Sequence, residues 1–365
     1  MDLDIFYNRY RTLKKIGEGG LGTVFLAEDT WNGRKVALKL LDSPKTSVFL
    51  KRLFQKEFKL LQNLKHPGLP QVYDFFVSQT GKVGYTLEFV PGEPFLAEKK
   101  VLDLKTFYPL ALQICQILDF IHAHKIIHRD LKPQNFLVSG AVKSKTEAHF
   151  GIKLIDFGLA SSHLEKDKNV KGTLGYISPE ILKGEGFDQR ADLYSLGVIF
   201  YQALTGKLPF DYADPALLMA AQLEQKPLPP HKYNSKIPLE LSQLILKLLE
   251  VNPENRISDI SLVQATLDKL SRSKIHETYF TAYLESGRAV GLAGPLRFFR
   301  QNLKKPDFNL CLISGEKGVG KTTLLREMKF LAQSAGYLTL EIKAVPRKPA
   351  SEKLLESVKS IYNYL

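Results

Sequence analysis

Two carboxylates, an amide and a lysine lie close together near the middle of the chain, on segments between short apolar runs. Asp130, Lys132 and Asn135 fall within six residues, and Asp156 follows a predicted strand. Buried charges between strands are costly unless they are paired or bind a metal, which argues against a purely structural role. Phosphoryl transfer needs such a set: Asp130 to accept a hydroxyl proton, Lys132 as a cation near the transferred group, and Asn135 with Asp156 as oxygen ligands for Mg²⁺.

A glycine-rich segment and a second lysine lie nearer the N-terminus. Residues 17–22 fit G-x-G-x-x-G, and β-branched and aromatic residues follow. A dinucleotide-binding fold needs such glycines to lead into a helix, so this context indicates a hairpin whose backbone amides cover phosphates; an incidental turn explains the motif alone equally well. Lys39 ends an apolar strand, where a solvated lysine is the ordinary interpretation. An ion pair with Glu57, on a predicted helix, would instead hold its ammonium toward the α- and β-phosphates.

The elements that must position these residues fall into two parts. Alternating and helical spacings predict a mainly antiparallel sheet with one helix, at residues 47–65, within the first 90 residues. Longer helical periods follow at 104–124, 192–205, 239–250 and 260–270, with short strands at 136–138 and 152–155. A small β-rich lobe joined to a larger helical lobe makes a cleft, and ligands favour such junctions.

Residues 10–270 resemble a eukaryotic-type (Hanks-type) serine/threonine protein kinase domain. The resemblance rests on the glycine loop, Lys39, the stretch His-Arg-Asp-Leu-Lys-Pro-Gln-Asn at 128–135, and Asp-Phe-Gly at 156–158. It implies a bilobal α+β fold, with an N-lobe at about 10–90 and a C-lobe at about 91–270, and ATP with Mg²⁺ as cofactors. The lysine two positions after Asp130 is similar to the serine/threonine group. The implied acceptor is therefore a serine or threonine hydroxyl of a protein, with autophosphorylation of this chain included.

The resemblance also implies roles for residues around the nucleotide. Leu87 would be the gatekeeper, and the hinge would offer its backbone groups. The residues expected to contact ATP are Ile16, Gly17, Gly19, Gly22, Val24, Ala37, Lys39, Leu87, Glu88, Val90 and Leu137. Outside the nucleotide site, Glu180 is expected to pair with Arg256, and Asp192 to brace the catalytic loop.

A second nucleotide motif lies near the C-terminus. Residues 315–322 fit G-x-x-x-x-G-K-[ST] between a strand predicted at 309–314 and a helix predicted at 323–334. Amides from Gly315 to Gly320 would hold phosphates, Lys321 would reach the terminal phosphate, and Thr322 would bind Mg²⁺. The alternative is an ordinary glycine turn at the start of a helix.

The sequence after residue 295 resembles the opening of an AAA-like or STAND-type ATPase, behind a linker at 271–294. A preceding helix is expected at 296–303, a second strand at 337–343 and another helix at 351–364. No later strand ends in the acidic residues that such an ATPase needs, so segment 295–365 is expected to be incomplete. The chain is then the N-terminal part of a longer kinase–ATPase protein of the bacterial multidomain kind, or it carries a vestigial P-loop unit.

Composition narrows the function classes. The 365 residues carry a net charge of +13, and residues 271–365 hold 16 basic and 8 acidic side chains against 35 and 30 in the first 270. This charge is compatible with a nucleic-acid partner, but a surface that binds polyphosphate explains it equally well. Because the sequence contains no recognisable nucleic-acid-binding motif, a nucleic-acid partner is disfavoured. Two cysteines exclude a disulfide scaffold, and no apolar run reaches the roughly 18 residues of a membrane span. A cytoplasmic setting is expected.

These observations together predict a serine/threonine protein kinase that acts in intracellular signalling. The alternative is a nucleotide-regulated signalling scaffold in which the P-loop ATPase module of a longer chain is the switch. The intact set of catalytic residues disfavours the scaffold.

Overall fold

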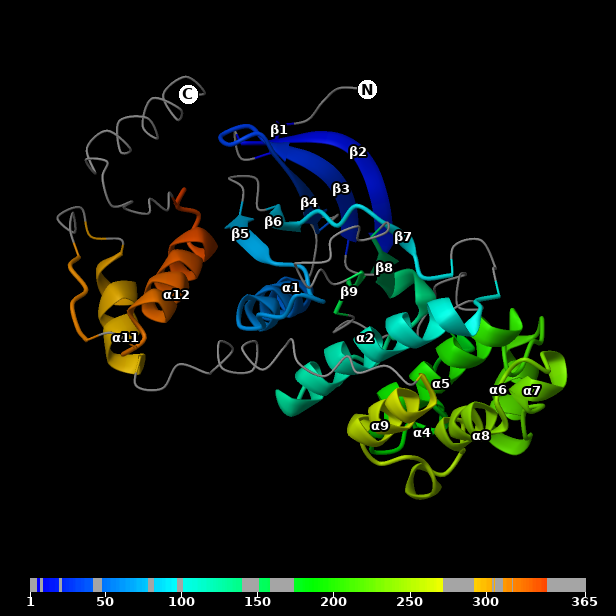
Figure 1. Cartoon of the computed structure of the whole chain (residues 1–365). Coiled ribbons are helices and arrows are strands. Elements are labelled where there is room, and N and C mark those ends of the chain that lie inside the picture. The colour runs from blue at the N-terminus through cyan, green and yellow to red at the C-terminus, as the bar shows by residue number, and fades with distance from the viewer. Residues whose placement is uncertain are drawn as a thin grey trace. The chain divides into compact units, whose positions relative to one another are not determined.

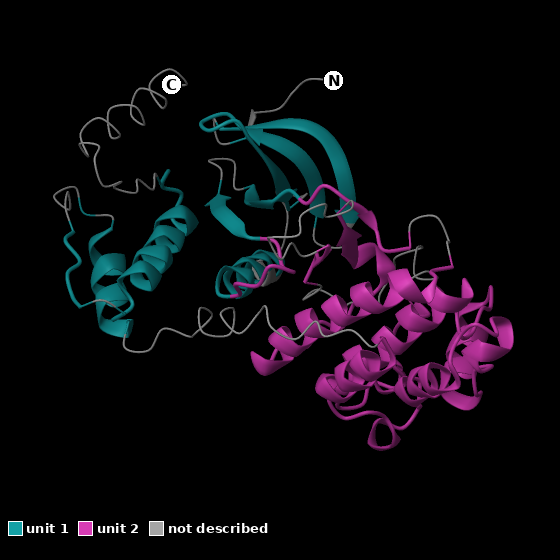
Figure 2. Ribbon diagram, in the orientation of Figure 1, with its two compact units in different colours: residues 1–63, 71–89, 286–365 teal, residues 64–70, 90–285 magenta. Residues whose placement is uncertain are grey.

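The computed structural model describes residues 5–6, 9–19, 22–41, 48–77, 82–96, 101–139, 151–157, 174–271, 292–303, 305, 311–316 and 318–339. The chain forms two compact units, coloured separately in Figure 2. Unit 1 comprises residues 1–63, 71–89 and 286–365, and unit 2 comprises residues 64–70 and 90–285. The beginning and the end of the sequence therefore belong to the same unit.

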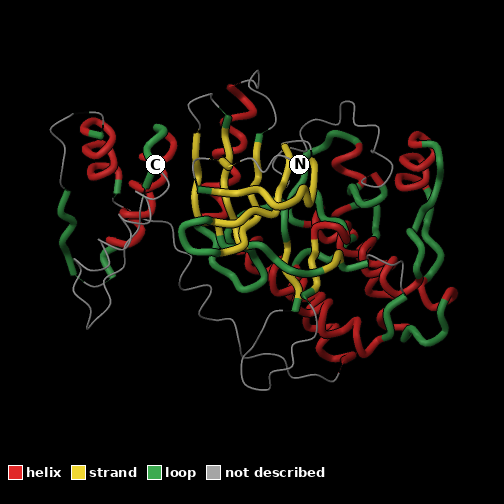
Figure 3. The backbone as a smooth tube through the Cα atoms, turned by 90° about the horizontal axis from the view of Figure 1, so that it is seen from above, coloured by secondary structure: helices red, strands yellow, loops and turns green. Residues whose placement is uncertain are grey.

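Unit 1 contains a six-stranded antiparallel sheet with the order β1-β2-β3-β4-β6-β5, in which β5 is an edge strand (Figures 1 and 3). Its strands are β1 (Ile5–Phe6), β2 (Tyr10–Gly19), β3 (Gly22–Asp29), β4 (Arg34–Leu40), β5 (Val72–Val77) and β6 (Val83–Glu88). The turn between β3 and β4 uses Gly33 with φ of 69°, a left-handed conformation that glycine adopts without a steric penalty. The predicted antiparallel sheet is confirmed.

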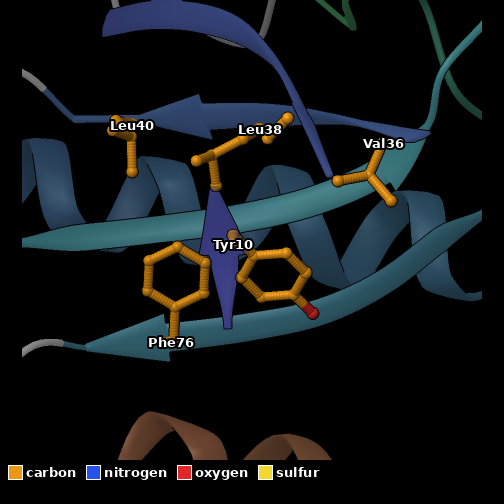
Figure 4. Close-up of a cluster of buried hydrophobic side chains, with 6 residues drawn as sticks. Tyr10, Val36, Leu38, Leu40 and Phe76 are labelled. Carbon is orange, nitrogen blue, oxygen red and sulfur yellow. The ribbon is translucent and has the colours of Figure 1, made fainter. Parts of the chain in front are cut away.

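The two faces of this sheet bury different apolar sets, because successive side chains of a strand point to opposite faces. Tyr10, Val36, Leu38, Leu40 and Phe76 gather in one buried cluster together with Ala27 (Figure 4). The residues next to them along the strands point to the other face, against which helix α1 (Val48–Gln62) packs. There the centroid of the Phe58 ring lies 5.4 Å from that of Phe75 and 5.7 Å from that of Tyr85. The helix predicted at 47–65 is therefore confirmed and belongs to the core of this unit.

Two further helices of unit 1 come from the end of the sequence. They are α11 (Ala293–Asn302) and α12 (Lys321–Ser334), which confirm the helices predicted at 296–303 and 323–334. The strand predicted at 309–314 is wrong over residues 311–314, which have no strand structure and where Leu312 is 88% exposed. A strand needs a hydrogen-bonded neighbour, and none is found among the described residues from 292 to 339. Residues 337–339 also form no strand; residues 340–343 and the helix predicted at 351–364 lie outside the described residues.

Unit 2 is mainly helical. Its helices are α2 (Leu104–Ala123), α4 (Pro179–Leu182), α5 (Arg190–Thr205), α6 (Pro215–Glu224), α7 (Pro230–Tyr233), α8 (Leu239–Leu248) and α9 (Ile260–Ser271). Helix α5 is buried on nearly every side, as expected of a helix that is apolar all round, and α2, α7 and α8 pack against it. The four long helices predicted from residue 104 onward are confirmed. Among the described residues, no helix has the length and apolar character that crossing a membrane requires.

A small sheet with the order β7-β8-β9 accompanies these helices. It consists of β7 (Glu93–Pro94), β8 (Phe136–Val138) and β9 (Ile152–Leu154), and the predicted strands at 136–138 and 152–155 are confirmed. The β-rich part at the start of the chain and the helical part after it confirm the predicted α+β class.

Candidate active site

The loop between α2 and β8 in unit 2 carries two predicted catalytic residues, Asp130 and Lys132, and one predicted Mg²⁺ ligand, Asn135. It ends in a single 3₁₀ turn, η1 (Pro133–Asn135), directly before β8. The backbone N–H of Ile155 donates to the carbonyl oxygen of Asn135 at 2.7 Å, which places Asp156 beside Asn135. The pairing of β8 with β9 thus brings together residues that are about 20 positions apart in the sequence.

Side-chain contacts join the residues of this loop. The ammonium of Lys132 lies 2.9 Å from Oδ2 of Asp130. Nδ2 of Asn135 donates to the Asp130 carbonyl oxygen at 2.7 Å and lies 3.5 Å from its Oδ2. Because Asn135 uses its amide nitrogen here, its Oδ1 is the atom that can accept a cation. A carboxylate and an amide oxygen form the hard donor set that Mg²⁺ prefers, so Asn135 and Asp156 fit this ion.

A buried carboxylate braces the loop, as the sequence predicts. Asp192, which is fully buried on α5, accepts hydrogen bonds from the backbone N–H groups of His128 and Arg129, each at 2.9 Å. Nε2 of His122 lies 2.8 Å from the same carboxylate. Burial alone would raise the pKa of Asp192, but the hydrogen bond and charge of His122 together with the contacts to His128 lower it overall. Asp192 therefore stays ionised and can hold the loop through charge-assisted hydrogen bonds.

Sequence reasoning missed His122. The signal was a polar side chain on a helix whose neighbouring positions, Phe120 and Ile121, are completely buried. A histidine in such a position needs a buried partner, which is Asp192.

Two residues at this site have left-handed backbone conformations. The φ angles are 71° for Arg129 and 62° for Asp156, values that are rare for residues other than glycine. Such conformations persist where surrounding contacts hold them, and the hydrogen bond from Arg129 to Asp192 is one such contact. The expectation that these charges are buried is wrong for Asp156, which is exposed. Its backbone is fixed by the hairpin while its side chain reaches solvent.

The predicted pair of Glu180 with Arg256 is also present in unit 2. The two terminal nitrogens of Arg256 lie 2.8 and 3.0 Å from the two carboxylate oxygens of Glu180. Two predicted adenine contacts belong to unit 2 as well: Val90 is buried, and Leu137 lies on β8 opposite Pro94 and Lys153.

Unit 1 contains the second predicted set. The ammonium of Lys39, at the end of β4, lies 2.9 Å from Oε1 of Glu57 on α1, and both residues are buried. The predicted ion pair is therefore confirmed. The ring of Tyr85, on the neighbouring strand, lies 5.9 Å from the same ammonium. Lys39 is thus held by a helix and a strand of the same unit.

The predicted nucleotide contacts of unit 1 lie along one part of its sheet. Lys39 is paired with Val24 on β3, and Ala37 with Leu87 on β6. Paired residues and residues two apart share a face, so these four side chains lie on the same face of the sheet. The backbone N–H of Glu88 already donates to the carbonyl of Gln71 at 2.7 Å.

The glycine-rich segment forms the predicted hairpin between β2 and β3. Gly17 pairs with Val24, Gly19 pairs with Gly22, and Ile16 is exposed on β2. A Cβ atom on Gly22 would lie only 1.9 Å from the carbonyl oxygen of Leu40, so this position requires glycine.

The second nucleotide motif forms a turn that leads into α12. Gly315, Gly318 and Gly320 have φ angles of 155°, 92° and 94°. The ammonium of Lys321 donates to the carbonyl oxygens of Gly315 and Glu316, each at 2.7 Å. Thr322, the next residue of α12, is exposed. The motif thus curls around its own lysine at the N-terminal end of the helix.

Comparison with known proteins identifies relatives of the larger part of the chain. Residues 10–268 match the family described as "Protein kinase domain". A probable serine/threonine-protein kinase of Clostridium perfringens is 34% identical over 277 residues, which cover 73% of this chain and 39% of that protein. The serine/threonine-protein kinase PknB of Mycobacterium tuberculosis is 32% identical over 308 residues, which cover 79% of this chain and 48% of that kinase. The chain therefore spans less than half the length of these relatives.

Proposed function

The chain belongs to the protein kinase family, and from this premise we propose that it transfers the γ-phosphate of ATP to serine or threonine hydroxyls of proteins, its own chain included. The observation that carries the proposal is the set Asp130, Lys132 and Asn135, which are hydrogen-bonded to one another on a loop that Asp192 braces. A scaffold that only binds partners has no need of this arrangement.

Each residue has a defined task in this proposal. The hydroxyl oxygen of the substrate bonds to the γ-phosphorus, the bond to the β,γ-bridging oxygen breaks, and the hydroxyl proton passes to Asp130. Lys132 neutralises charge that develops on the transferred group. Lys39, held by Glu57, orients the α- and β-phosphates. Asn135 and Asp156 would hold Mg²⁺, which neutralises phosphate charge when it is bound.

Incorporation of labelled phosphate tests the proposal. The full chain, labelled ATP, MgCl₂ and a generic acceptor such as casein should give phosphoserine or phosphothreonine after hydrolysis. Asp130→Asn and Lys39→Met should each abolish incorporation, whereas Lys35→Met, on an exposed position of the same strand, should not. Incorporation that survives Asp130→Asn, or phosphotyrosine as the product, would contradict the assignment.

We also propose that residues 295–365 are the incomplete opening of an AAA-like or STAND-type P-loop ATPase, with 271–294 as a linker and with Gly315, Gly320, Lys321 and Thr322 as phosphate contacts. The left-handed glycines and the start of α12 at Lys321 support this assignment, while the missing strand over 311–314 does not. Calorimetric titration with ATP should show two sites per chain and only one for Lys321→Ala. Lys305→Ala, a change just before the motif, should leave both sites. A single site in the unmodified chain would refute this proposal.

A further inference from the structure

Helix α12 covers the edge of the six-stranded sheet in unit 1, beside β5 (orange next to β5 in Figure 1). An edge strand presents backbone groups that no neighbouring strand satisfies. Oε1 of Gln333 accepts a hydrogen bond from the backbone N–H of Phe75 at 3.0 Å, and the ammonium of Lys329 donates to the carbonyl of Tyr73 at 3.2 Å. Two side chains of α12 thus form hydrogen bonds with backbone groups of β5, as a neighbouring strand would.

A buried carboxylate ties the same helix to β5. Asp74 is 5% exposed, and its Oδ1 lies 2.8 Å from both Nε2 of Gln333 and the ammonium of Lys329. Its Oδ2 accepts from the hydroxyl of Tyr10 at 2.7 Å and lies 3.2 Å from the Arg9 guanidinium. Burial alone would raise the pKa of Asp74, but the charges of Lys329 and Arg9 lower it overall. Taking α12 away would remove two of the partners of this buried carboxylate, which is costly in free energy.

Helix α12 also contacts α1, which carries Glu57. The buried ring of Phe330 stacks on Phe58 with 5.5 Å between ring centroids and lies 5.4 Å from Phe75. Lys59, the next residue of α1, lies 3.6 Å from Glu327 and places its ammonium 4.5 Å from the Phe330 ring. Two of the α1 residues that α12 contacts, Phe58 and Lys59, therefore directly follow Glu57.

We propose that α12 is a brace that positions α1 so that Glu57 meets Lys39, and that phosphoryl transfer depends on this helix although it lies outside the matched residues 10–268. The inference rests on the proposed kinase function. Phe330 is its central positioning residue, acting through Phe58 on the orientation of α1. The nucleotide contacts and the catalytic loop contribute no residue to the brace.

Variants of the full chain test the brace. Phe330→Ala should lower kcat/KM for ATP about two- to tenfold, the range expected for losing an aromatic pair, and should increase hydrogen exchange of the α1 amides. Leu325→Ala is the matched control, because Leu325 is 55% exposed on the same helix, and it should change neither quantity. Phe330→Leu, which keeps an apolar side chain, should restore part of the rate. An unchanged fluorescence of Trp31, the single tryptophan, would show that unit 1 remains folded.

A double-variant comparison separates positioning from general stability. If Phe330 acts through Glu57, then Phe330→Ala should cause no further loss of kcat/KM in a Glu57→Gln chain. An equal loss in both backgrounds, or wild-type kinetics and exchange for Phe330→Ala in an active chain, would overturn the brace and leave the proposed function standing. An unmodified chain without activity would contradict the proposed function instead, and the exchange of α1 would then decide the brace alone.

Discussion

The strongest stability prediction concerns the pair of Arg256 and Glu180. The Arg256 side chain is completely buried and that of Glu180 is 3% exposed. Besides binding both oxygens of Glu180, the guanidinium donates to the carbonyls of Glu250 at 2.9 Å and Arg190 at 2.7 Å. It thereby joins α4 to the start of α5 and to the segment that follows α8.

Glu180→Gln removes the carboxylate charge and leaves the guanidinium without a counterion in a place that water does not reach. Breaking a buried ion pair from one side costs about 3–5 kcal/mol, so we expect the free energy of unfolding of unit 2 to fall by about that amount. A neighbouring pair provides the control. Arg190 lies 2.9 Å from Glu254, but Glu254 is 75% exposed, and a solvated pair of this kind contributes about 1 kcal/mol or less. Glu254→Gln should therefore change the stability by no more than that.

Urea unfolding followed by circular dichroism at 222 nm measures this difference, because most of the helices that the structure describes belong to unit 2. Trp31 fluorescence follows unit 1 in the same titration. Its urea midpoint should be the same in both variants as in the unmodified chain. A loss below about 1 kcal/mol for Glu180→Gln, or equal losses for Glu180→Gln and Glu254→Gln, would refute the argument that burial sets the cost of breaking the pair.

Three further predictions follow from single positions. Burial lowers the pKa of His66 to about 4, below the ordinary 6.5, so its contribution to stability is complete above pH 6.5 and about 3 kcal/mol is lost as the pH falls toward 4; urea titrations of His66→Asn should lack this loss. Asp192→Asn should lower the free energy of unfolding by about 2 kcal/mol in the same assay, because one of its oxygens no longer accepts from a backbone N–H. Gly22→Ala should raise KM for ATP, since its Cβ would meet the Leu40 carbonyl, whereas Gly33→Ala, which meets no heavy atom within 4 Å and strains only the β3–β4 turn, should leave KM unchanged.

The features predicted from the sequence are those that depend on short segments of the chain, such as single helices and strands. The spacing of apolar residues locates the long helices and the first strands because burial on one face imposes a period of 3.6 or 2 residues. The pair of Lys39 with Glu57 was predicted from a strand-end lysine and a glutamate on the predicted helix, and that of Glu180 with Arg256 from the resemblance to the kinase family; both pairs are confirmed.

What the sequence did not predict depends on contacts between distant segments. The exposure of Asp156 follows from how the β8–β9 hairpin presents it, which its apolar neighbours in the sequence do not reveal. The strand expected at 309–314 has an apolar composition typical of a buried strand, yet residues 311–314 find no partner among the described strands. Composition indicates that a segment can form a strand, whereas a hydrogen-bonded neighbour decides whether it does.

The contact between α12 and the sheet was not predicted, for a further reason. The residues of α12 that belong to the glycine-rich motif differ from those that contact α1 and β5. Its 14 residues span about 20 Å, so Lys321 and Gln333 lie near opposite ends. The side chains that contact α1 and β5 begin at Arg326, whose guanidinium lies 3.4 Å from the Gln62 carbonyl, and continue to Gln333. The glycine-rich motif at 315–322 reaches only into the first turn of α12. A recognisable motif at the start of a helix therefore leaves the rest of its surface unassigned, and that remaining surface is what joins α12 to the sheet.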